Sequence, residues 1–194
     1  MKRICVFCGS KSGNRPVYAE MAQRLGETLA ARQLELVYGG GAIGLMGVVA
    51  RATLSAGGRV TGIMPRRLAE KEVLLTEATE NIIVETMHQR KAMMADRSDG
   101  FIAMPGGYGT CEEFFEILTW SQLGIHTKPM ALLNTAGFFD PLLAWIDGMV
   151  HEGFLRPRFR ELLIVGTDPE DTLARMERYF PPLPPDQLLN EIQR

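Results

Sequence analysis

The sequence predicts an α/β protein, with a single-domain, doubly wound and mostly parallel sheet of Rossmann-like type and helices on both faces. Short apolar runs typical of buried strands alternate with longer runs of helical periodicity. Two glycine-rich loops each follow a strand-like run, at the carboxyl ends where such sheets bind ligands. With 194 residues and 46% hydrophobic content, the chain is long enough for one well-buried core. We therefore expect one domain over residues 1–180, followed by a Pro-rich C-terminal tail over 181–194.

Strands and helices alternate through the first half of the chain. The run over 16–32 carries apolar side chains at every fourth position from Val17 to Leu29, so these side chains share one face of a helix. The run over 66–79 is rich in charged residues and predicts a mobile segment. The other elements expected in this half are strands over 2–8, 34–38 and 59–64 and a helix over 45–55.

Proline marks the starts of two helices in the second half. Asp140-Pro141 and Asp168-Pro169 each place a proline at the first helical position, where its missing N–H costs nothing. Asp168 is the expected N-cap of the last helix. The strands expected in this half are 81–84, 101–104, 128–133 and 162–165, and the helices are 87–97, 114–123, 140–151 and one that begins at Asp168.

Residues 104–113, Met-Pro-Gly-Gly-Tyr-Gly-Thr-Cys-Glu-Glu, have the composition of a phosphate-binding loop between a strand and a helix. Gly106, Gly107 and Gly109 let the backbone turn tightly and approach a ligand without a Cβ in the way. The free N–H groups and the dipole at the start of the next helix favour an anion, and Thr110 adds a hydroxyl donor. We call this loop the phosphate cradle.

Two carboxylates, Glu112 and Glu113, follow the cradle within one helical turn. Because a carboxylate repels a bound phosphate, these side chains need another reason to be there. One reason is chemistry on the sugar or base that is attached to the phosphate. The other is structural, since Thr110-x-x-Glu113 also fits a capping box, in which Glu113 reaches back to the N–H of Thr110.

A second glycine-rich loop, over 38–47, matches the G-x-G-x-x-G pattern at Gly39, Gly41 and Gly44. In a dinucleotide enzyme, an acidic residue that holds the ribose should end the following strand. Here that strand is followed by Arg66 and Arg67, which suit the extra phosphate of NADP. An NADP-binding oxidoreductase therefore stays open as an alternative.

The interpretation that we favour gives the second loop to a mononucleotide. Its backbone, at Gly40 and Gly41, would approach the ligand closely, as the cradle does. Gly9 and Ser10, at the end of the first strand, would form a third wall of the same pocket.

The composition argues against a nucleic-acid-binding, secreted or membrane protein. A net charge of −2 and an isoelectric point near 6.0 give no basic footprint for nucleic acid. The N-terminal apolar stretch is too short for a signal peptide, and no segment approaches the length of a membrane span. We therefore expect a cytoplasmic protein that binds a small molecule, with its three cysteines reduced.

No metal or cofactor is expected. Cys5 and Cys8 have the C-x-x-C spacing, but they fall on a strand, where side chains three apart point to opposite faces. The three histidines, His88, His126 and His151, are not spaced with cysteines or carboxylates as a metal site requires.

Arg90 and Lys91 stand on the helix that precedes the cradle in the chain. One strand later the cradle begins, so the fold can present Arg90 beside Glu113 across one pocket. Alone, an arginine on this helix would be an ordinary exposed side chain.

The stretch 87–91, Met-His-Gln-Arg-Lys, followed by residues 98–113, closely resembles the Lonely Guy family of cytokinin-activating phosphoribohydrolases. The stretches 7–10, 38–47 and 120–126 resemble the same family in the same order, so the likeness spans most of the chain.

The resemblance implies a function and a set of site residues. Members hydrolyse the N-glycosidic bond of a nucleoside 5′-monophosphate, AMP or N6-modified AMP, into free base and ribose 5-phosphate, and form at least a homodimer with pockets near the interface. The family's catalytic arginine and glutamate fall on Arg90 and Glu113. Its nucleotide-binding positions fall on Glu72, Lys91, Gly107, Tyr108, Gly109, Thr110, Cys111, Glu112 and Thr119.

Two more functions stay open beside the oxidoreductase. A non-catalytic nucleotide or cofactor carrier can share the fold and the cradle, because a fold does not fix a function. Proteins with the Pro-Gly-Gly-x-Gly-Thr-x-x-Glu motif have also been labelled lysine decarboxylases. Such an enzyme needs a lysine that binds pyridoxal phosphate, and Lys91 is the one plausible position.

Overall fold

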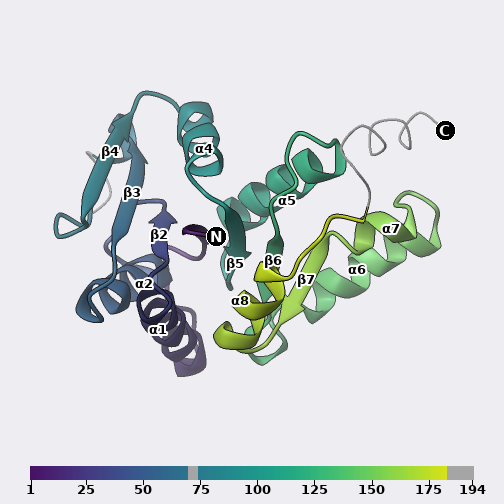
Figure 1. Ribbon diagram of the computed structural model, residues 1–194, viewed down its shortest axis with the longest axis horizontal. Coiled ribbons are helices and arrows are strands. Elements are labelled where there is room, and N and C mark those ends of the chain that lie inside the picture. The colour runs from purple at the N-terminus through teal and green to yellow at the C-terminus, as the bar shows by residue number, and fades with distance from the viewer. Residues whose placement is uncertain (70–73, 183–194) are drawn as a thin grey trace.

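The computed structural model describes residues 1–69 and 74–182 and confirms the predicted fold class (Figure 1). Seven parallel strands form one sheet in the order β4-β3-β2-β1-β5-β6-β7. The strands are β1 (Arg3–Phe7), β2 (Glu35–Tyr38), β3 (Val60–Pro65), β4 (Glu80–Val84), β5 (Gly100–Ala103), β6 (Met130–Leu133) and β7 (Leu163–Gly166).

The helices lie between the strands in the sequence. The longer ones are α1 (Pro16–Ala31), α2 (Gly44–Ser55), α4 (Met87–Asp96), α5 (Tyr108–Gln122), α6 (Asp140–His151) and α8 (Pro169–Glu177). The structure adds three short helical segments that periodicity did not predict, because each spans about one turn: α3 (Arg66–Ala69), η1 (Thr135–Gly137) and α7 (Pro157–Arg160).

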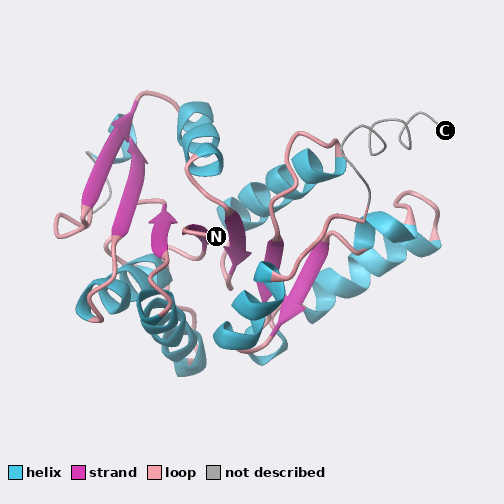
Figure 2. Cartoon of the chain, viewed as in Figure 1, coloured by secondary structure: helices cyan, strands magenta, loops and turns pink. Residues whose placement is uncertain are grey.

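Helices cover both faces of the sheet (Figure 2). On β1, Ile4 and Val6 pack into one apolar cluster together with residues of α1, α2 and α8. Cys5 and Phe7 pack into the other, with residues of α4, α5 and α6. Cys8 belongs to the first cluster, so the two cysteines of the C-x-x-C sequence face opposite sides of the sheet, as predicted.

The order of strands reverses at β1. The chain builds β2, β3 and β4 outward on one side of β1 and then returns to place β5 on the other side. In doubly wound sheets, this switch point opens a crevice at the carboxyl ends of the two central strands. Here the ends of β1 and β5 are joined by a hydrogen bond of 3.0 Å, which the N–H of Gly9 donates to the carbonyl of Pro105 in the cradle.

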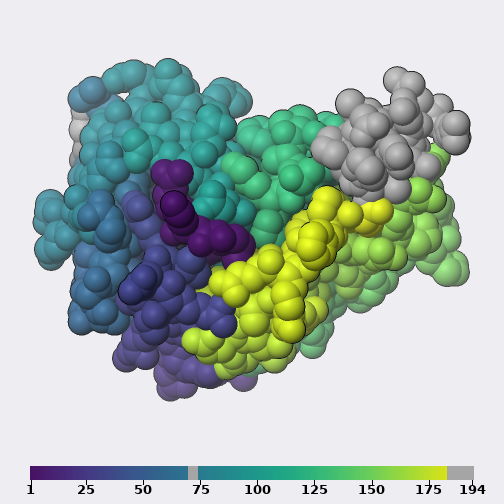
Figure 3. Space-filling view, viewed as in Figure 1, coloured from purple at the N-terminus to yellow at the C-terminus, as the bar shows by residue number. Residues whose placement is uncertain are grey.

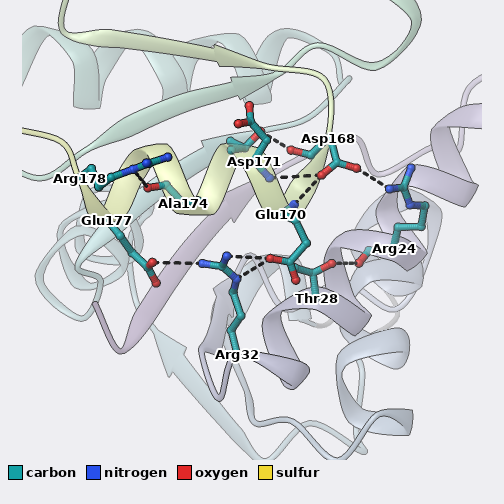
Figure 4. A network of polar contacts seen from close by, with 10 residues as sticks. Arg24, Thr28, Arg32, Asp168, Glu170, Asp171, Ala174, Glu177 and Arg178 are labelled. Atoms are coloured by element: carbon teal, nitrogen blue, oxygen red, sulfur yellow. Dashed lines mark hydrogen bonds and ion pairs between the residues drawn. The ribbon is translucent and has the colours of Figure 1, made fainter.

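Ion pairs join α1 to α8 across the sequence (Figure 4). Arg24 contacts Asp168 at 2.5 Å, and Arg32 contacts Glu170 at 2.7 Å and Glu177 at 3.2 Å. The Asp168 carboxylate also accepts hydrogen bonds from two backbone N–H groups in the first turn of α8, which confirms the predicted N-cap. The first and last helices are thereby held on the same face of the sheet.

The N-terminus and α8 meet at the amino ends of the strands. Gly100 begins β5 between the side chains of Met1 and Met176, with its Cβ position 3.3 Å from Met1 Sδ and 2.9 Å from Met176 Cε. The space-filling view shows the N-terminal surface, in purple, next to the α8 surface, in yellow (Figure 3). The side chains of Met1 and Met176 therefore cover the start of β5, and the glycine-rich loops lie at the opposite end of the sheet.

Two expectations about local structure are wrong. The helix predicted over 114–123 already begins at Tyr108 with Gly107 as its N-cap, and no side chain among the described residues caps it. Thr110 is instead buried against Gly106, so the proposed capping box with Glu113 does not form.

In the charged segment over 66–79, for which we expected mobility, the described residues 66–69 and 74–79 make regular contacts. It includes α3, and Leu74 pairs with Gly41 in an isolated bridge. Leu75 is 1% exposed and its N–H donates to the carbonyl of Gly40 at 3.1 Å. These two backbone contacts fasten the end of the charged segment to the second glycine-rich loop.

Candidate functional site

The cradle ends in an exposed helix N-terminus. The backbone N–H groups of Tyr108, Gly109 and Thr110 have no acceptor within residues 1–69 and 74–182, as expected for a first helical turn. Cβ positions at Gly107 and Gly109 meet no described atom within 4 Å, so both residues face open space. Tyr108 between them is 97% exposed. The site can therefore accept an anion on free amides and the helix dipole.

The other glycine of the cradle, Gly106, has a packing role. A Cβ there would stand 2.1 Å from Oγ1 of Thr110 and 3.0 Å from the amide nitrogen of Gly9. Gly9 itself is buried, and its carbonyl accepts hydrogen bonds of 3.0 and 3.4 Å from the first residues of α2. Ser10 is exposed beside it. The ends of β1 and β5 and the start of α2 thus form one connected floor.

Arg90 is fixed by the start of α4. Thr86 is the N-cap, and its hydroxyl accepts a hydrogen bond from the N–H of Gln89, whose side chain in turn accepts one from the N–H of Thr86. This complete capping box places Arg90 in the first turn, pointing toward the sheet. Its Nε donates to the carbonyl of Ile63 at 3.1 Å, and its Nη2 donates to the carbonyl of Gly39 at 3.2 Å.

The predicted proximity of Arg90 and Glu113 is confirmed. Nη1 of Arg90 lies 3.8 Å from Oε1 of Glu113, and the side chains are only 12% and 14% exposed. Burial raises the pKa of Glu113 to about 7, although the charges of Arg90 and Lys91 work in the opposite direction. A carboxyl group whose pKa is raised in this way suits acid–base or electrostatic catalysis.

Lys91, the next residue on α4, makes a second set of contacts to α5. Its Nζ donates to Glu112 in a short hydrogen bond and to Oε1 of Glu116 at 2.9 Å. Burial opposes the charged form of Lys91, but the hydrogen bonds and charges of both glutamates outweigh it and raise the pKa of Lys91. Two adjacent cations of α4 therefore face three carboxylates of α5.

The protein's own side chains occupy the space beside the glycines of the second glycine-rich loop. A Cβ on Gly39 would stand 1.9 Å from Nη2 of Arg90. The corresponding positions at Gly40 and Gly41 lie 3.3 Å from Met64 and 2.9 Å from Met46, and both glycines are buried. A glycine is therefore needed at position 39 to make room for Arg90, and a bound dinucleotide is not required to explain it.

Three other expected nucleotide-binding residues make none of these contacts among the described residues. Cys111 is half-buried in the first turn of α5. Thr119 is exposed further along α5, where its hydroxyl donates to the carbonyl of Phe115 at 2.7 Å. Glu72 lies outside the described residues.

Sequence reasoning missed several residues that build the site. The Thr86-x-x-Gln89 spacing is itself a capping-box signal and would have fixed the start of α4. Glu116 stands four residues after Glu112, a spacing that puts both on one face of a helix. The carbonyls that hold Arg90, by contrast, have no side-chain signature.

Chemically, the arrangement combines an anion site with a titrating carboxylate. An anionic group on the amides of α5 would lie within the first turn of the helix that carries Glu113 in its second turn. Among the described residues, no helix is long and apolar enough to cross a membrane.

Comparisons with known proteins agree on one family. The protein-family profile described as "Possible lysine decarboxylase" matches residues 46–176. Two proteins of Arabidopsis thaliana named cytokinin riboside 5′-monophosphate phosphoribohydrolase are each 49% identical over 180 residues. That alignment covers 93% of this chain and 84% and 79% of the two relatives.

Solved structures of lower identity share the fold. The molybdenum cofactor carrier protein of Chlamydomonas reinhardtii is 21% identical, with a TM-score of 0.69 over 91% of this chain and 96% of its own. The molybdenum cofactor binding protein of Rippkaea orientalis is also 21% identical, with a TM-score of 0.69 over 92% of this chain and 97% of its own.

Proposed function

This chain belongs to the cytokinin riboside 5′-monophosphate phosphoribohydrolase family, and on that premise we propose that it hydrolyses the N-glycosidic bond of AMP or an N6-modified AMP. The products are the free base and ribose 5-phosphate. The observation that carries the proposal is the pairing of Arg90 with Glu113 directly behind a helix N-terminus that is open to an anion.

The 5′-phosphate binds at the start of α5. The amides of the cradle from Gly106 to Thr110 and the helix dipole attract the dianion, and the open space at Gly107 and Gly109 lets it approach the backbone. Binding energy from this remote group positions the reacting bond at the far end of the ribose.

Glu113 acts at the anomeric carbon. As the bond from C1′ to the base nitrogen breaks, the electron pair leaves with the base and the sugar gains oxocarbenium character. The ionised Glu113 stabilises this positive charge and orients the attacking water. The water supplies the hydroxyl at C1′, and its proton balances the one that the departing base takes up.

Arg90 favours the ionised form of Glu113, against the larger effect of burial, and holds the side chain in place. Its guanidinium is fixed by two backbone carbonyls, so its charge stands beside Glu113 before any substrate binds. Glu112 and Lys91 flank this pair and contact the nucleotide, in agreement with the family's nucleotide-binding positions. Glu72, Tyr108, Cys111, Gly9 and Ser10 are proposed contacts of the same ligand. The expected walls at Gly40 and Gly41 are left out of the proposal, because Met64 and Met46 cover them.

Base release tests this proposal. Purified protein is incubated with AMP and with N6-isopentenyl-AMP, and free base and ribose 5-phosphate are quantified by chromatography. Equal amounts of both products support the proposal, and the ratio of the two rates distinguishes an AMP-type from a cytokinin-type enzyme. Tight binding of both nucleotides without product would instead favour a carrier, a function for which the shared fold is equally suitable.

The site argues against a lysine decarboxylase and against an NADP-binding oxidoreductase. A lysine that forms a Schiff base needs a lowered pKa, whereas Glu112 and Glu116 raise the pKa of Lys91. An NADP site would need the backbone of Gly39 for the pyrophosphate, and Arg90 covers that position. A titration with NADPH fluorescence and an absorbance spectrum for bound pyridoxal phosphate test both points.

A homodimer is part of the proposal. Thr119 and Phe115 stand one turn apart on the same face of α5, and Trp145 of α6 packs on Phe115 with ring centroids 5.9 Å apart while 59% exposed. We call these three residues the α5–α6 surface. An exposed aromatic surface of this kind is typical of protein interfaces, and pairing through it would bring Thr119 near the pocket of a partner.

Light scattering tests the dimer. The chain has a mass of 21.6 kDa, and a homodimer has twice that mass. Trp145→Glu on the α5–α6 surface should give a monomer, and a monomeric wild type would contradict the proposal. We further propose that residues 1–180 act as one catalytic domain in the cytoplasm, which its three free cysteines support.

A further inference from the structure

Glu116 is a third carboxylate that the proposed reaction leaves without a role. It lies on α5, one turn after Glu112, with a side chain that is 24% exposed. One oxygen, Oε1, accepts a hydrogen bond of 2.9 Å from Nζ of Lys91. The other, Oε2, is fully covered by the protein and receives no hydrogen bond from any residue that the structure describes.

This arrangement makes Glu116 depend on Lys91. A buried carboxylate oxygen without a donor is costly, so compensation of the charge rests on the single ammonium group. The dependence is mutual, because a lysine ammonium on a four-carbon stem is mobile unless several acceptors fix it. Glu112 is 55% exposed and a weak anchor by itself, whereas Glu116 is the more buried of the two partners.

We propose that Glu116 is a positioning residue: it anchors the ammonium group of Lys91 against α5, away from Glu113, and so aligns Lys91 for the nucleotide. This inference rests on the proposed function. Lys91 has three N–H donors, and Glu112 and Glu116 take two of them, so one donor is left for the substrate. Without Glu116, Lys91 moves toward Glu112 and Glu113 and competes with Arg90.

The charge of Glu116 also affects how readily Glu113 ionises, because several charged groups surround Glu113. From α4 it faces Arg90 and Lys91, and from its own helix Glu112 and Glu116. From the sheet, the thiol of Cys5 lies on the side of α4 and α5, and that of Cys8 lies on the other side at the end of β1. Burial, and then the charge of Glu113, raises the pKa of both thiols, so they stay neutral. Removing the negative charge of Glu116, with Lys91 free to approach, therefore makes Glu113 easier to ionise.

Glu116→Gln keeps the shape of the side chain and removes its charge. We expect KM for AMP to rise roughly five- to tenfold, as for loss of one charged anchoring contact, with kcat near neutral pH within about twofold. The acid limb of the kcat/KM profile should shift about half a pH unit lower, the size of a unit charge one helical turn away in a water-like medium. Glu20→Gln, at an exposed position of α1, is the matched control and should change neither value.

A double-mutant cycle with Lys91→Met separates positioning from folding. If Glu116 acts through Lys91, then Glu116→Gln adds less than about twofold to KM in the Lys91→Met background. Fully additive effects, or an unchanged KM and acid limb in Glu116→Gln, would overturn the inference. A wild type that binds AMP without releasing base would refute the proposed function instead, and Glu116→Gln would still be expected to weaken AMP binding in calorimetry if the inference holds.

Discussion

Glu113→Gln should make the protein inactive and, at alkaline pH, more stable. The folded-state pKa of Glu113 is raised by burial to about 7, from 4.5 for an ordinary glutamate. The unfolded chain therefore loses this proton at a lower pH than the folded chain does. The contribution of Glu113 to stability is present at low pH and is lost as the pH rises from 4.5 through 7.

The size of the effect follows from the same shift. A change from 4.5 to about 7 corresponds to about 3 kcal/mol of folding free energy well above pH 7, at about 1.4 kcal/mol per pH unit. Near pH 5 the cost is below about 1 kcal/mol, because the folded side chain is still protonated there. A neutral glutamine avoids this cost at every pH, so Glu113→Gln should gain roughly 2 kcal/mol on wild type between about pH 5 and about pH 8.5.

Thermal unfolding of both proteins at the two pH values measures this gain. For a chain of this length, about 2 kcal/mol corresponds to a relative increase in Tm of roughly 4 to 8 °C. All other titrating groups cancel, because the comparison is between variants at the same pH. Glu20→Gln, on the exposed side of α1, should show no pH-dependent difference from wild type. A Glu113→Gln difference that is equal at both pH values would refute the inference that Glu113 is buried with a raised pKa.

Three further substitutions test the site and the fold. Gly39→Ala places a Cβ 1.9 Å from Nη2 of Arg90 and should lower kcat/KM on the order of 100-fold, with little change in Tm. Gly148→Ala is its control and should leave kcat/KM unchanged, because a Cβ there meets no described atom within 4 Å. Gly107→Ala should fold normally, because its Cβ position is open, but raise KM for AMP by blocking the approach of the phosphate; an unchanged KM would place the phosphate elsewhere. Asp168→Ala removes the cap of α8 and should lower the unfolding free energy by about 1 kcal/mol in urea titrations, with unaltered turnover.

The regular elements of the fold were predictable because each buries a periodic face. The alternating apolar runs indicated the parallel sheet, and Asp168-Pro169 indicated the start of α8 together with its cap. The start of α5 was missed because Tyr108-Gly-Thr looks like a loop, and glycine disfavours a helix by its propensity. Leu75 was missed because its N–H bonds to the carbonyl of Gly40, far earlier in the chain, and its side chain packs into a core built from distant elements.

The sequence predicted which side chains meet in the candidate site, but not the backbone groups that hold them in place. The proximity of Arg90 and Glu113 followed from two adjacent strand–helix units and a familiar motif. The direction of Arg90 depends on carbonyl groups of β3 and of the second glycine-rich loop, which every residue possesses. The pKa of Glu113 depends on how deeply α4 and α5 bury it, and burial is a property of the assembled fold.

The central claim is that Glu113 performs the chemistry while the cradle binds the phosphate. The most direct test compares binding with turnover in Glu113→Gln, by calorimetry with AMP and by chromatographic release of base and ribose 5-phosphate. We predict a Kd for AMP within about threefold of wild type and a rate of base release at least roughly 100-fold lower. Base release at the wild-type rate, or loss of AMP binding together with activity, would contradict the claim.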